Sequence, residues 1–244
     1  MGIFAVAGSK FYLGTTAAVD FTSYASALAN FAADSYTEVT PMETIGDFGD
    51  TATDVKFLGI GDKRARHLKG SQDAGVQTLT AGFDASDLGQ QAMKAAFNSS
   101  QDFNAKVVFN DAPVAISATV TITIAAPGVV SWTAHGLAVG DAVKFTTTGA
   151  LPTGLTAGTT YYVKTVPDAN SFTVSATPGG SAITTTGTQS GVHTGTTVPS
   201  GTIAYYRGKV MAFKRVMGTG PDNVIKLECN FGINSDIIEV PAAQ

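Results

Sequence analysis

The feature that most constrains this chain is a long internal stretch that is almost free of charge. Residues 117–198 contain four charged side chains and 21 threonines, and most of the chain's 15 basic and 19 acidic residues lie on either side of them. Threonine suits strands because its branched side chain packs on a pleated surface while its hydroxyl tolerates water. This abrupt change in composition indicates a separate folding unit inserted into a host chain.

Within this stretch the residue pattern predicts a small all-β module. Val120, Ile122 and Ile124 alternate with threonine in TVTITI, and Phe172 and Val174 alternate with polar residues in SFTVSA. Such alternation places one set of side chains in a core and the other in water. We expect further strands in DAVKF and TTYYVKTV, separated by turns rich in glycine, proline and asparagine.

The first flank predicts strands around one clear helix. VQTLTAGF and AKVVF are strand-like, and DASDLGQQAMKAAFNSS between them has helical spacing. Asp84 and Ser86 are the N-cap candidates, and Asp87 suits the positive end of the helix dipole. The expected apolar stripe comprises Leu88, Ala92 and Ala95 or Ala96, with Met93 and Phe97 beside it. DFTSYASALANF is a second, weaker helix candidate.

The second flank predicts a long hairpin. Its strands are GTIAYYRGKVMAFKRV and VIKLECNFGI, and its turn is MGTGPDN. The apolar face of the second strand comprises Ile225, Leu227, Cys229, Phe231 and Ile233. Lys226, Glu228 and Asn230 alternate with these residues, so one face of the strand belongs to a core and the other is wet.

Together these patterns predict a mainly β protein whose host domain is split in the sequence. Residues 1–115 and 200–244 form this discontinuous host, and residues 116–199 form the inserted all-β module. The module lies where a hairpin loop would otherwise connect VVFNDAP to GTIAYY, and exposed loop tips tolerate insertions.

Composition argues against several classes of protein. A net charge of −4 and a pI of about 5.2 disfavour tight binding of nucleic acid, which needs a clustered basic surface. Cys229 is the one cysteine, so neither an intrachain disulfide nor a cysteine-based zinc site is expected. The N-terminal sequence lacks the pattern of a signal peptide, and no apolar run is long enough to span a membrane.

The residues that could carry chemistry do not form a reactive pattern. The chain has no Gly-x-Ser-x-Gly elbow, and His67, His135 and His193 have no catalytic partner motif. His135 and Asp141 lack the spacing of metal ligands, and GIGDKRARHLKG lacks the phosphate-loop pattern. We therefore expect no catalytic, metal-binding or cofactor-binding residue and no enzymatic activity.

One short loop of the host is strongly basic. Lys63, Arg64, Arg66 and Lys69 lie close together in a chain that is acidic as a whole. This pattern suits a contact with acidic groups of another subunit, because complementary charge fixes the register of an interface. Plain solvation and nucleic-acid binding are the alternatives.

A series of segments in both flanks resembles the tail tube, or major tail, proteins of long-tailed bacteriophages. The segments are GSKFYLGT, METIGDFGDTATDVKF, KRARHLKGSQDAG, DLGQQAMKAAF and VIKLECNFGINSDIIEVP, and together they span nearly all of the host. The resemblance implies subunits of two packed antiparallel sheets, sandwich- or barrel-like, with one flanking helix. These subunits are expected to form hexameric rings whose inner sheets join into one β-barrel and which stack into a hollow tube. The resemblance also implies a place in the virion after synthesis in the host bacterial cytoplasm, in a flexible, non-contractile tail.

The same resemblance implies partners and contacts. The expected partners are further copies of the chain, the tape-measure protein, the tail terminator and the distal tail or tip proteins, with transient passage of DNA and no membrane insertion. Residues 46–70 are expected to reach a neighbouring subunit or ring, and their deletion to leave folded protein that does not polymerise. The contact candidates are Ile45, Asp47, Phe48, Asp50, Lys63, Arg64, Arg66 and Lys69. The candidates for the lumen or another wet face are Lys226, Glu228 and Asn230.

The inserted module is similar to the first catalytic-cysteine half-domain fold of ubiquitin-activating enzymes. HGLAVGDAVKF, LPTGLTAGTTYYV, NSFTVSATPGGSAI and GTQSGVHTG carry the similarity, which implies no thioester chemistry because the module has no cysteine. We expect the module on the tube exterior, where it leaves the lumen open. The alternative function is a β-rich carbohydrate-binding or adhesion module that uses Trp132, Tyr161 and Tyr162, although these rings also suit core packing.

Overall fold

The chain divides into two compact units in a computed structural model that describes residues 6–218 and 224–244. The first unit comprises Met1–Asn110 and Ile203–Val240, and the second comprises Asp111–Thr202 and Pro241–Gln244. Antiparallel strands dominate both units, and two helices accompany them in the described residues. The predicted mainly β fold with a small all-β module is confirmed. Most of the predicted MGTGPDN turn, residues 219–223, lies outside the described residues.

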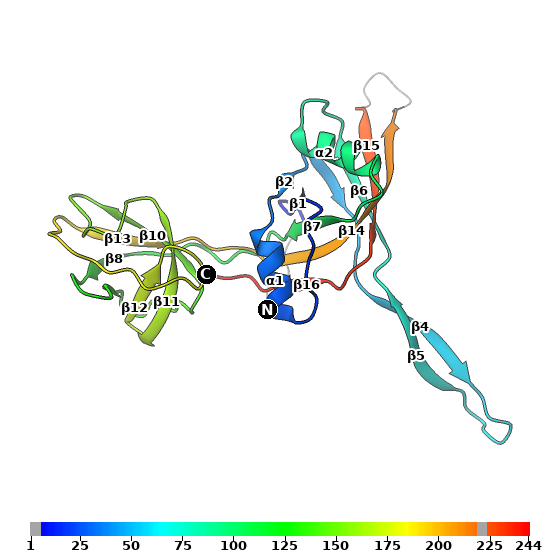
Figure 1. Ribbon diagram of the computed structural model, residues 1–244, viewed down its shortest axis with the longest axis horizontal. Coiled ribbons are helices and arrows are strands. Elements are labelled where there is room, and N and C mark those ends of the chain that lie inside the picture. The colour runs from blue at the N-terminus through cyan, green and yellow to red at the C-terminus, as the bar shows by residue number, and fades with distance from the viewer. Residues whose placement is uncertain (1–5, 219–223) are drawn as a thin grey trace. The chain divides into compact units, whose positions relative to one another are not determined.

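An eight-stranded antiparallel sheet forms the body of the first unit (Figure 1). Its strand order is β2-β1-β7-β14-β15-β6-β3, and β16 pairs with the start of β14. The strands are β1 (Lys10–Leu13), β2 (Thr37–Glu38), β3 (Met42–Ile45), β6 (Val76–Gly82), β7 (Phe103–Val108), β14 (Ile203–Val216), β15 (Lys226–Ile233) and β16 (Ile238–Val240).

This sheet curls until its two halves face each other across one core. Phe11 of β1 and Phe231 of β15 are three strands apart in the sheet, yet their ring centroids are 6.2 Å apart. A flat sheet would separate them by about 14 Å, because neighbouring strands are about 4.8 Å apart. The two expected sheets are therefore two halves of one sheet. The long β14 joins them, because its first half pairs with β7 and its second half pairs with β15.

Strand β15 shows the predicted alternation. Its buried residues are Leu227, Cys229, Phe231 and Ile233. Lys226, Glu228 and Asn230 alternate with them and are half-buried. Ile225, predicted to belong to the apolar face, is 41% exposed because it precedes the first residue of the strand.

Two helices accompany the sheet, one more than the single flanking helix predicted. Helix α1 (Tyr24–Ala33) begins after Ser23, whose hydroxyl accepts a hydrogen bond from the Ser26 amide. It buries Phe31, which stacks on Tyr205 of β14 at 5.5 Å between ring centroids. The weaker of the two helix candidates in the sequence is therefore also a helix.

Helix α2 (Leu88–Phe97) differs from its prediction in both cap and buried face. Asp87 is the N-cap, rather than Asp84 or Ser86, and its carboxylate accepts a hydrogen bond from the Gln90 amide at 2.7 Å. The buried residues are Gly89, Gln90, Met93 and Ala96, whereas Leu88 and Phe97 are exposed. The glycine is required here, since a Cβ at position 89 would lie 2.1 Å from the Glu38 carbonyl oxygen.

Met93 and Ala96 of the predicted stripe are buried, but Gln90 joins them on the buried face in place of Leu88 and Phe97. The Gln90 amide nitrogen donates to the carbonyls of Thr40 and Gly82, and its oxygen accepts from the Asp84 amide. A buried amide that satisfies its hydrogen bonds in this way costs little and ties the helix to the β2–β3 loop and the end of β6.

The second unit is a closed six-stranded barrel in the order β10-β11-β12-β9-β8-β13. Its strands are β8 (Ser117–Ile122), β9 (Val129–Ser131), β10 (Ala142–Thr147), β11 (Thr160–Asp168), β12 (Ser171–Ser175) and β13 (His193–Thr197). Closure leaves no sheet edge. Phe145 and Phe172 are fully buried at its centre. Ile124, predicted to continue the inward face of its strand, is 48% exposed because β8 ends at Ile122.

The barrel enters the chain between two paired strands of the first unit. Val108 of β7 and Ile203 of β14 are register partners, so residues 109–202 stand in the place of a hairpin turn. Within the second unit, the Asp111 carboxylate accepts hydrogen bonds from the Thr202 amide and hydroxyl, and these bonds hold the pKa of Asp111 below its usual value. Ala243 pairs with Ser200, so the last four residues join this unit rather than the host.

Candidate assembly interface

The segment that the sequence singled out for contacts forms a separate two-stranded hairpin. Strands β4 (Thr51–Phe57) and β5 (Arg66–Asp73) pair only with each other among the described strands. Every residue of β4 is exposed, as is every residue of β5 except Gly70. An isolated two-stranded hairpin is at best marginally stable in water. A hairpin of this length that buries nothing against its own chain therefore indicates a surface for a partner.

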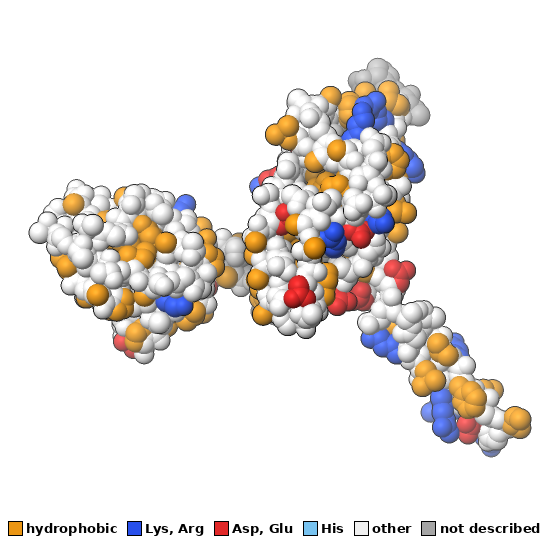
Figure 2. All heavy atoms as spheres, in the orientation of Figure 1, with side chains coloured by type: hydrophobic (Ala, Val, Ile, Leu, Met, Phe, Trp, Pro, Cys, Tyr) orange, Lys and Arg blue, Asp and Glu red, His pale blue; other side chains and the backbone are white. Residues whose placement is uncertain are grey.

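The strand register gives the hairpin two unlike faces. Val55 lies opposite Leu68, and Phe57 lies on the same face. These three side chains are 46%, 58% and 58% exposed. Figure 2 shows the hydrophobic side chains gathered along the hairpin beside its basic ones. This apolar face was not among the predicted contacts, although the alternation in TDVKF is a signal for it.

The opposite face of the hairpin is charged. His67 Nδ1 lies 2.9 Å from a carboxylate oxygen of Asp54, and the Lys56 ammonium lies 3.6 Å from the same carboxylate. Lys69, another predicted contact residue, stands opposite Asp54 in the register. The hairpin is therefore amphipathic, as an element with one face in water and one face on a partner is expected to be.

The loop at the end of the hairpin is both apolar and basic. We call residues 58–65 the hairpin tip. Leu58 is 62% exposed and Ile60 is fully exposed. The predicted contact residues Lys63 and Arg64 are also exposed, and Arg66 just beyond the tip forms a 3.4 Å ion pair with Asp62.

Residues 46–50 connect β3 to the hairpin, and we call them the strap. Unlike the hairpin, the strap contacts the core of its own chain. The Gly46 amide donates to the Thr78 carbonyl at 2.9 Å, and the Gln77 side chain donates to the Gly46 carbonyl at 3.0 Å. Phe48 packs on Tyr206, with 5.3 Å between ring centroids. Ile45, like Phe48, packs against the core of its own chain. The proposed deletion of residues 46–70 would therefore damage this core.

Tyr206 and Gln77 anchor this strap from inside. Both side chains are fully buried, and the tyrosine hydroxyl donates to the Gln77 amide oxygen. We expect Tyr206→Phe to lower the free energy of unfolding by about 1–3 kcal/mol, because it leaves a buried acceptor unpaired. Urea denaturation measures this change. Tyr162→Phe, at a half-buried barrel position, is the control; an equal loss in both variants would contradict the prediction.

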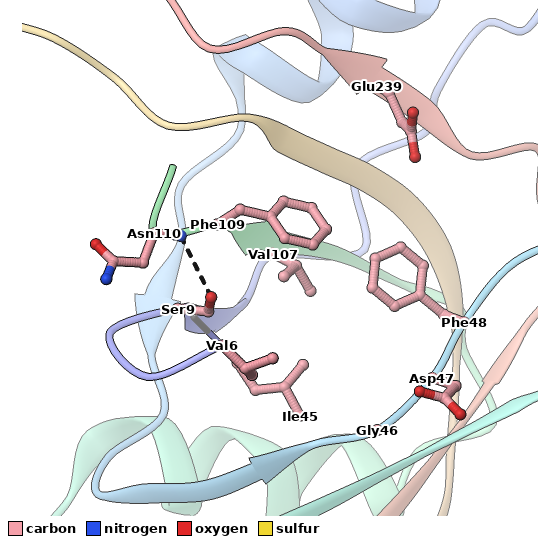
Figure 3. Close-up of a pocket in the computed structure, with 10 residues that line it drawn as sticks. All are labelled: Val6, Ser9, Ile45, Gly46, Asp47, Phe48, Val107, Phe109, Asn110 and Glu239. Carbon is pink, nitrogen blue, oxygen red and sulfur yellow. Dashed lines mark hydrogen bonds between the residues drawn. The ribbon is translucent and has the colours of Figure 1, made fainter. Parts of the chain in front are cut away.

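A surface pocket of about 480 Å³ opens beside the strap, and we call it the seam pocket. Figure 3 shows its apolar side chains directed inward from separate segments of the first unit. The lining residues are Val6, Ser9, Ile45, Gly46, Asp47, Phe48, Val107, Phe109, Asn110 and Glu239. The phenylalanine rings at positions 48 and 109 are 6.2 Å apart. Among these residues two are acidic and none is basic.

The predicted wet face carries ion pairs and one unsatisfied group. The Lys226 ammonium lies 2.6 Å from Glu43, and Glu228 lies 3.7 Å from Lys214. Oδ1 of Asn230 is buried without a hydrogen-bond partner among the described residues. These ion pairs hold the charged side chains on the sheet surface. The role of Lys226, Glu228 and Asn230 in assembly stays a prediction.

Most residues considered for chemistry or sugar binding in the barrel serve its interior, whereas Tyr162 is half-buried. His135 is buried, and its Nδ1 accepts a hydrogen bond from the Leu137 amide. The Asp141 carboxylate accepts from the Ala138 amide and closes a turn. Trp132 and Tyr161 are each 4% exposed, so these rings are not available for stacking on a sugar at the surface.

Cys229 behaves as a buried apolar residue. Burial, with a smaller contribution from Glu228, raises the pKa of its thiol to about 12. The thiolate is the reactive form of cysteine, so this side chain stays protonated and unreactive at neutral pH. Within residues 6–218 and 224–244 there is no group of three or more His, Cys, Asp or Glu side chains placed to hold a metal ion. Neither described helix is long and apolar enough to cross a membrane.

Comparison with known proteins gives distant structural likenesses. No protein-family model matches the chain, and no curated protein matches its sequence. A chain in the cryo-electron microscopy structure of the anti-feeding prophage baseplate, 6-fold symmetrised, aligns with a TM-score of 0.45 and 10% identity over 99% of this chain and 98% of that chain. A likeness this weak supports no inference about function.

Proposed function

We propose that this chain is a structural virion protein that assembles into hexameric rings, which stack into the hollow tail tube of a bacteriophage. DNA passes through this tube during ejection, and the chain performs no catalysis. The sequence resemblance in both flanks suggests the class. The amphipathic β4–β5 hairpin carries the proposal, because its exposed apolar face has no cover within its own described chain.

The open edges of the sheet support the same proposal. Strands β2 and β3 are the outer strands of the eight-stranded sheet, and each lacks a strand partner on one side among the described residues. Unpaired edges invite pairing with another chain, and closing a ring of copies removes them. A repeated head-to-tail contact between rings does not close on itself, so it extends a filament.

The remaining partners follow from the proposed tube. The tape-measure protein occupies the lumen before DNA does, and the tail terminator and the distal tail or tip proteins bind the tube ends. The net charge of −4 favours DNA that slides through without adhering. Lys226, Glu228 and Asn230 lie on a wall exposed to water, either the lumen or another wet surface.

Negative-stain electron microscopy of the concentrated protein tests the proposal. We expect rings with a central hole, or tubes built from them, and sedimentation velocity should show large species that grow with concentration. The experiment is repeated with the tail-tip complex as a nucleus. Dispersed particles of monomer size at every concentration, with and without this nucleus, would contradict the proposal.

The barrel is proposed to lie outside the tube. We expect assembly to survive replacement of residues 111–202 by Asn-Gly when the chain also ends at Val240. The strands β7 and β14 are already paired at Val108 and Ile203, so a short turn reconnects them. Electron micrographs should show a narrower tube with an unchanged central hole. Loss of polymerisation, or a wider hole, would contradict the exterior location.

A further inference from the structure

Two surfaces of the first unit are complementary in polarity and in charge. The hairpin tip presents exposed aliphatic side chains among basic residues, and the seam pocket presents apolar walls with acidic residues at its margin. We propose that the hairpin tip of one copy docks in the seam pocket of a second copy. This inference rests on the proposed function and names the contact through which the copies bind each other.

The acidic half of this contact is unpaired within its own chain. Asp47 and Glu239 line the seam pocket, and Asp50 lines an adjoining hollow that shares Phe48 and Glu239 with it. None of these three carboxylates forms an ion pair with another described residue. They are therefore free to meet cations from another molecule.

The basic side chains of the proposed contact are also unpaired within their own described chain. Lys63, Arg64 and Lys69 are exposed and form no ion pair within the described part of the chain. Lys63 and Arg64 of the tip, with Lys69 farther along β5, thus complement the three unpaired anions. Complementary charge of this kind steers association and fixes register.

The apolar components also match. Leu58 and Ile60 project from the tip with at least 62% of their surface exposed. The seam pocket offers Phe48 and Phe109, whose rings pack against each other, as one apolar wall (Figure 3). Its volume of about 480 Å³ lies within the range of about 300–1,000 Å³ that accommodates a compact ligand. Two aliphatic side chains therefore have room to enter.

The length of the hairpin makes the occupant a second copy. Strand β4 has seven residues, and a rise of about 3.3 Å per residue places the tip about 23 Å from the base of the hairpin. The seam pocket lies at that base, because Phe48 precedes β4 by three residues. The tip of an extended hairpin cannot turn back into its own pocket.

A charge exchange in the full chain tests the contact. The pocket variant carries Asp47→Lys, Asp50→Lys and Glu239→Lys, and the hairpin variant carries Lys63→Glu and Arg64→Glu in the tip and Lys69→Glu in β5. Each variant alone sets like charges against each other, so we expect its dissociation constant for self-association to rise at least about tenfold. An equimolar mixture pairs opposite charges again and should regain wild-type assembly in sedimentation velocity and micrographs. Lys94→Glu, a charge reversal on α2, should assemble like the wild type.

Disulfide trapping locates the same contact independently. The native Cys229 is buried and does not compete in crosslinking. A full chain with Ile60→Cys and Glu239→Cys should therefore form a ladder of disulfide-linked oligomers on oxidation. The matched chain with Ile60→Cys and Leu88→Cys should not. If the wild type assembles but the charge-exchanged mixture stays dispersed or the ladder fails to form, the docking inference is overturned while the proposed function stands. If the wild type never assembles, the proposed function itself fails, and the inference fails with it.

Discussion

Replacing residues 52–72 by Asn-Gly abolishes assembly of the chain and leaves its fold intact. Thr51 and Asp73 are register partners at the base of the hairpin, so a two-residue turn closes the shortened strands without distortion. The removed residues contribute nothing to the three buried clusters of the protein. We therefore expect wild-type circular dichroism, a melting temperature within about 2 °C of the wild type, and only monomers in sedimentation velocity.

The deletion begins after the strap because the strap packs against the core and is needed for the fold. A deletion that starts at residue 46 removes Phe48 and the Gly46 carbonyl that Gln77 binds, and the resulting loss of assembly could reflect a damaged core. Phe57→Ser on the hairpin and Leu88→Ser on α2 are a matched pair of exposed apolar positions. The first should impair assembly and the second should not. Tubes formed by the shortened chain would rule out the hairpin as the contact.

Phe231→Ala lowers the free energy of unfolding of the first unit by about 3–5 kcal/mol, the usual cost of removing a buried aromatic ring. This ring is fully buried and meets Phe11 at 6.2 Å and Tyr206 at 5.8 Å, both edge to face. It thus joins the two facing halves of the curled sheet. The loss is a large fraction of the 5–15 kcal/mol or so that stabilises a typical domain.

Phe145→Ala is the matched control for this prediction. Phe145 is equally buried but lies in the core of the barrel. Denaturation followed by hydrogen exchange should show Phe231→Ala weakening protection of the eight-stranded sheet and Phe145→Ala weakening protection of the barrel. Equal loss of protection in both units from either substitution would show that they unfold as one, against the division into two compact units.

Much of the local structure could be predicted from residue patterns. The alternation of Leu227, Cys229 and Phe231 with polar neighbours predicted β15, because a strand has a side-chain period of two and one face must be buried. The low charge of residues 117–198 predicted a separate β unit. Both predictions use only the order of residues that are close together in the chain, and this order can be read directly from the sequence.

Helix α2 marks the limit of such patterns. Its helical spacing was evident, but Leu88 is exposed and Gln90 is buried. The burial of Gln90 depends on the carbonyl of Thr40, in the loop between β2 and β3, and on that of Gly82 at the end of β6. No local pattern predicts that a polar side chain will form hydrogen bonds with these distant carbonyls.

Some residues of the candidate interface could also be predicted from the sequence, and others could not. The basic residues of the hairpin tip and Asp47 and Asp50 could be selected from the sequence because charge in a sparsely charged chain is conspicuous. Phe109 and Glu239 could not, because they reach the seam pocket through the pairing of distant strands.

The strands, the inserted unit and the charged segment follow from local sequence, because they depend on side-chain periodicity and composition over short distances. The curling of one sheet on itself, the packing of Phe48 against the core while Phe57 stays exposed, and the acidic residues of a pocket beside a basic hairpin all require the tertiary fold. Those features arise from strand pairings between residues far apart in the chain. Their energies depend on which surfaces meet, and local sequence does not specify that.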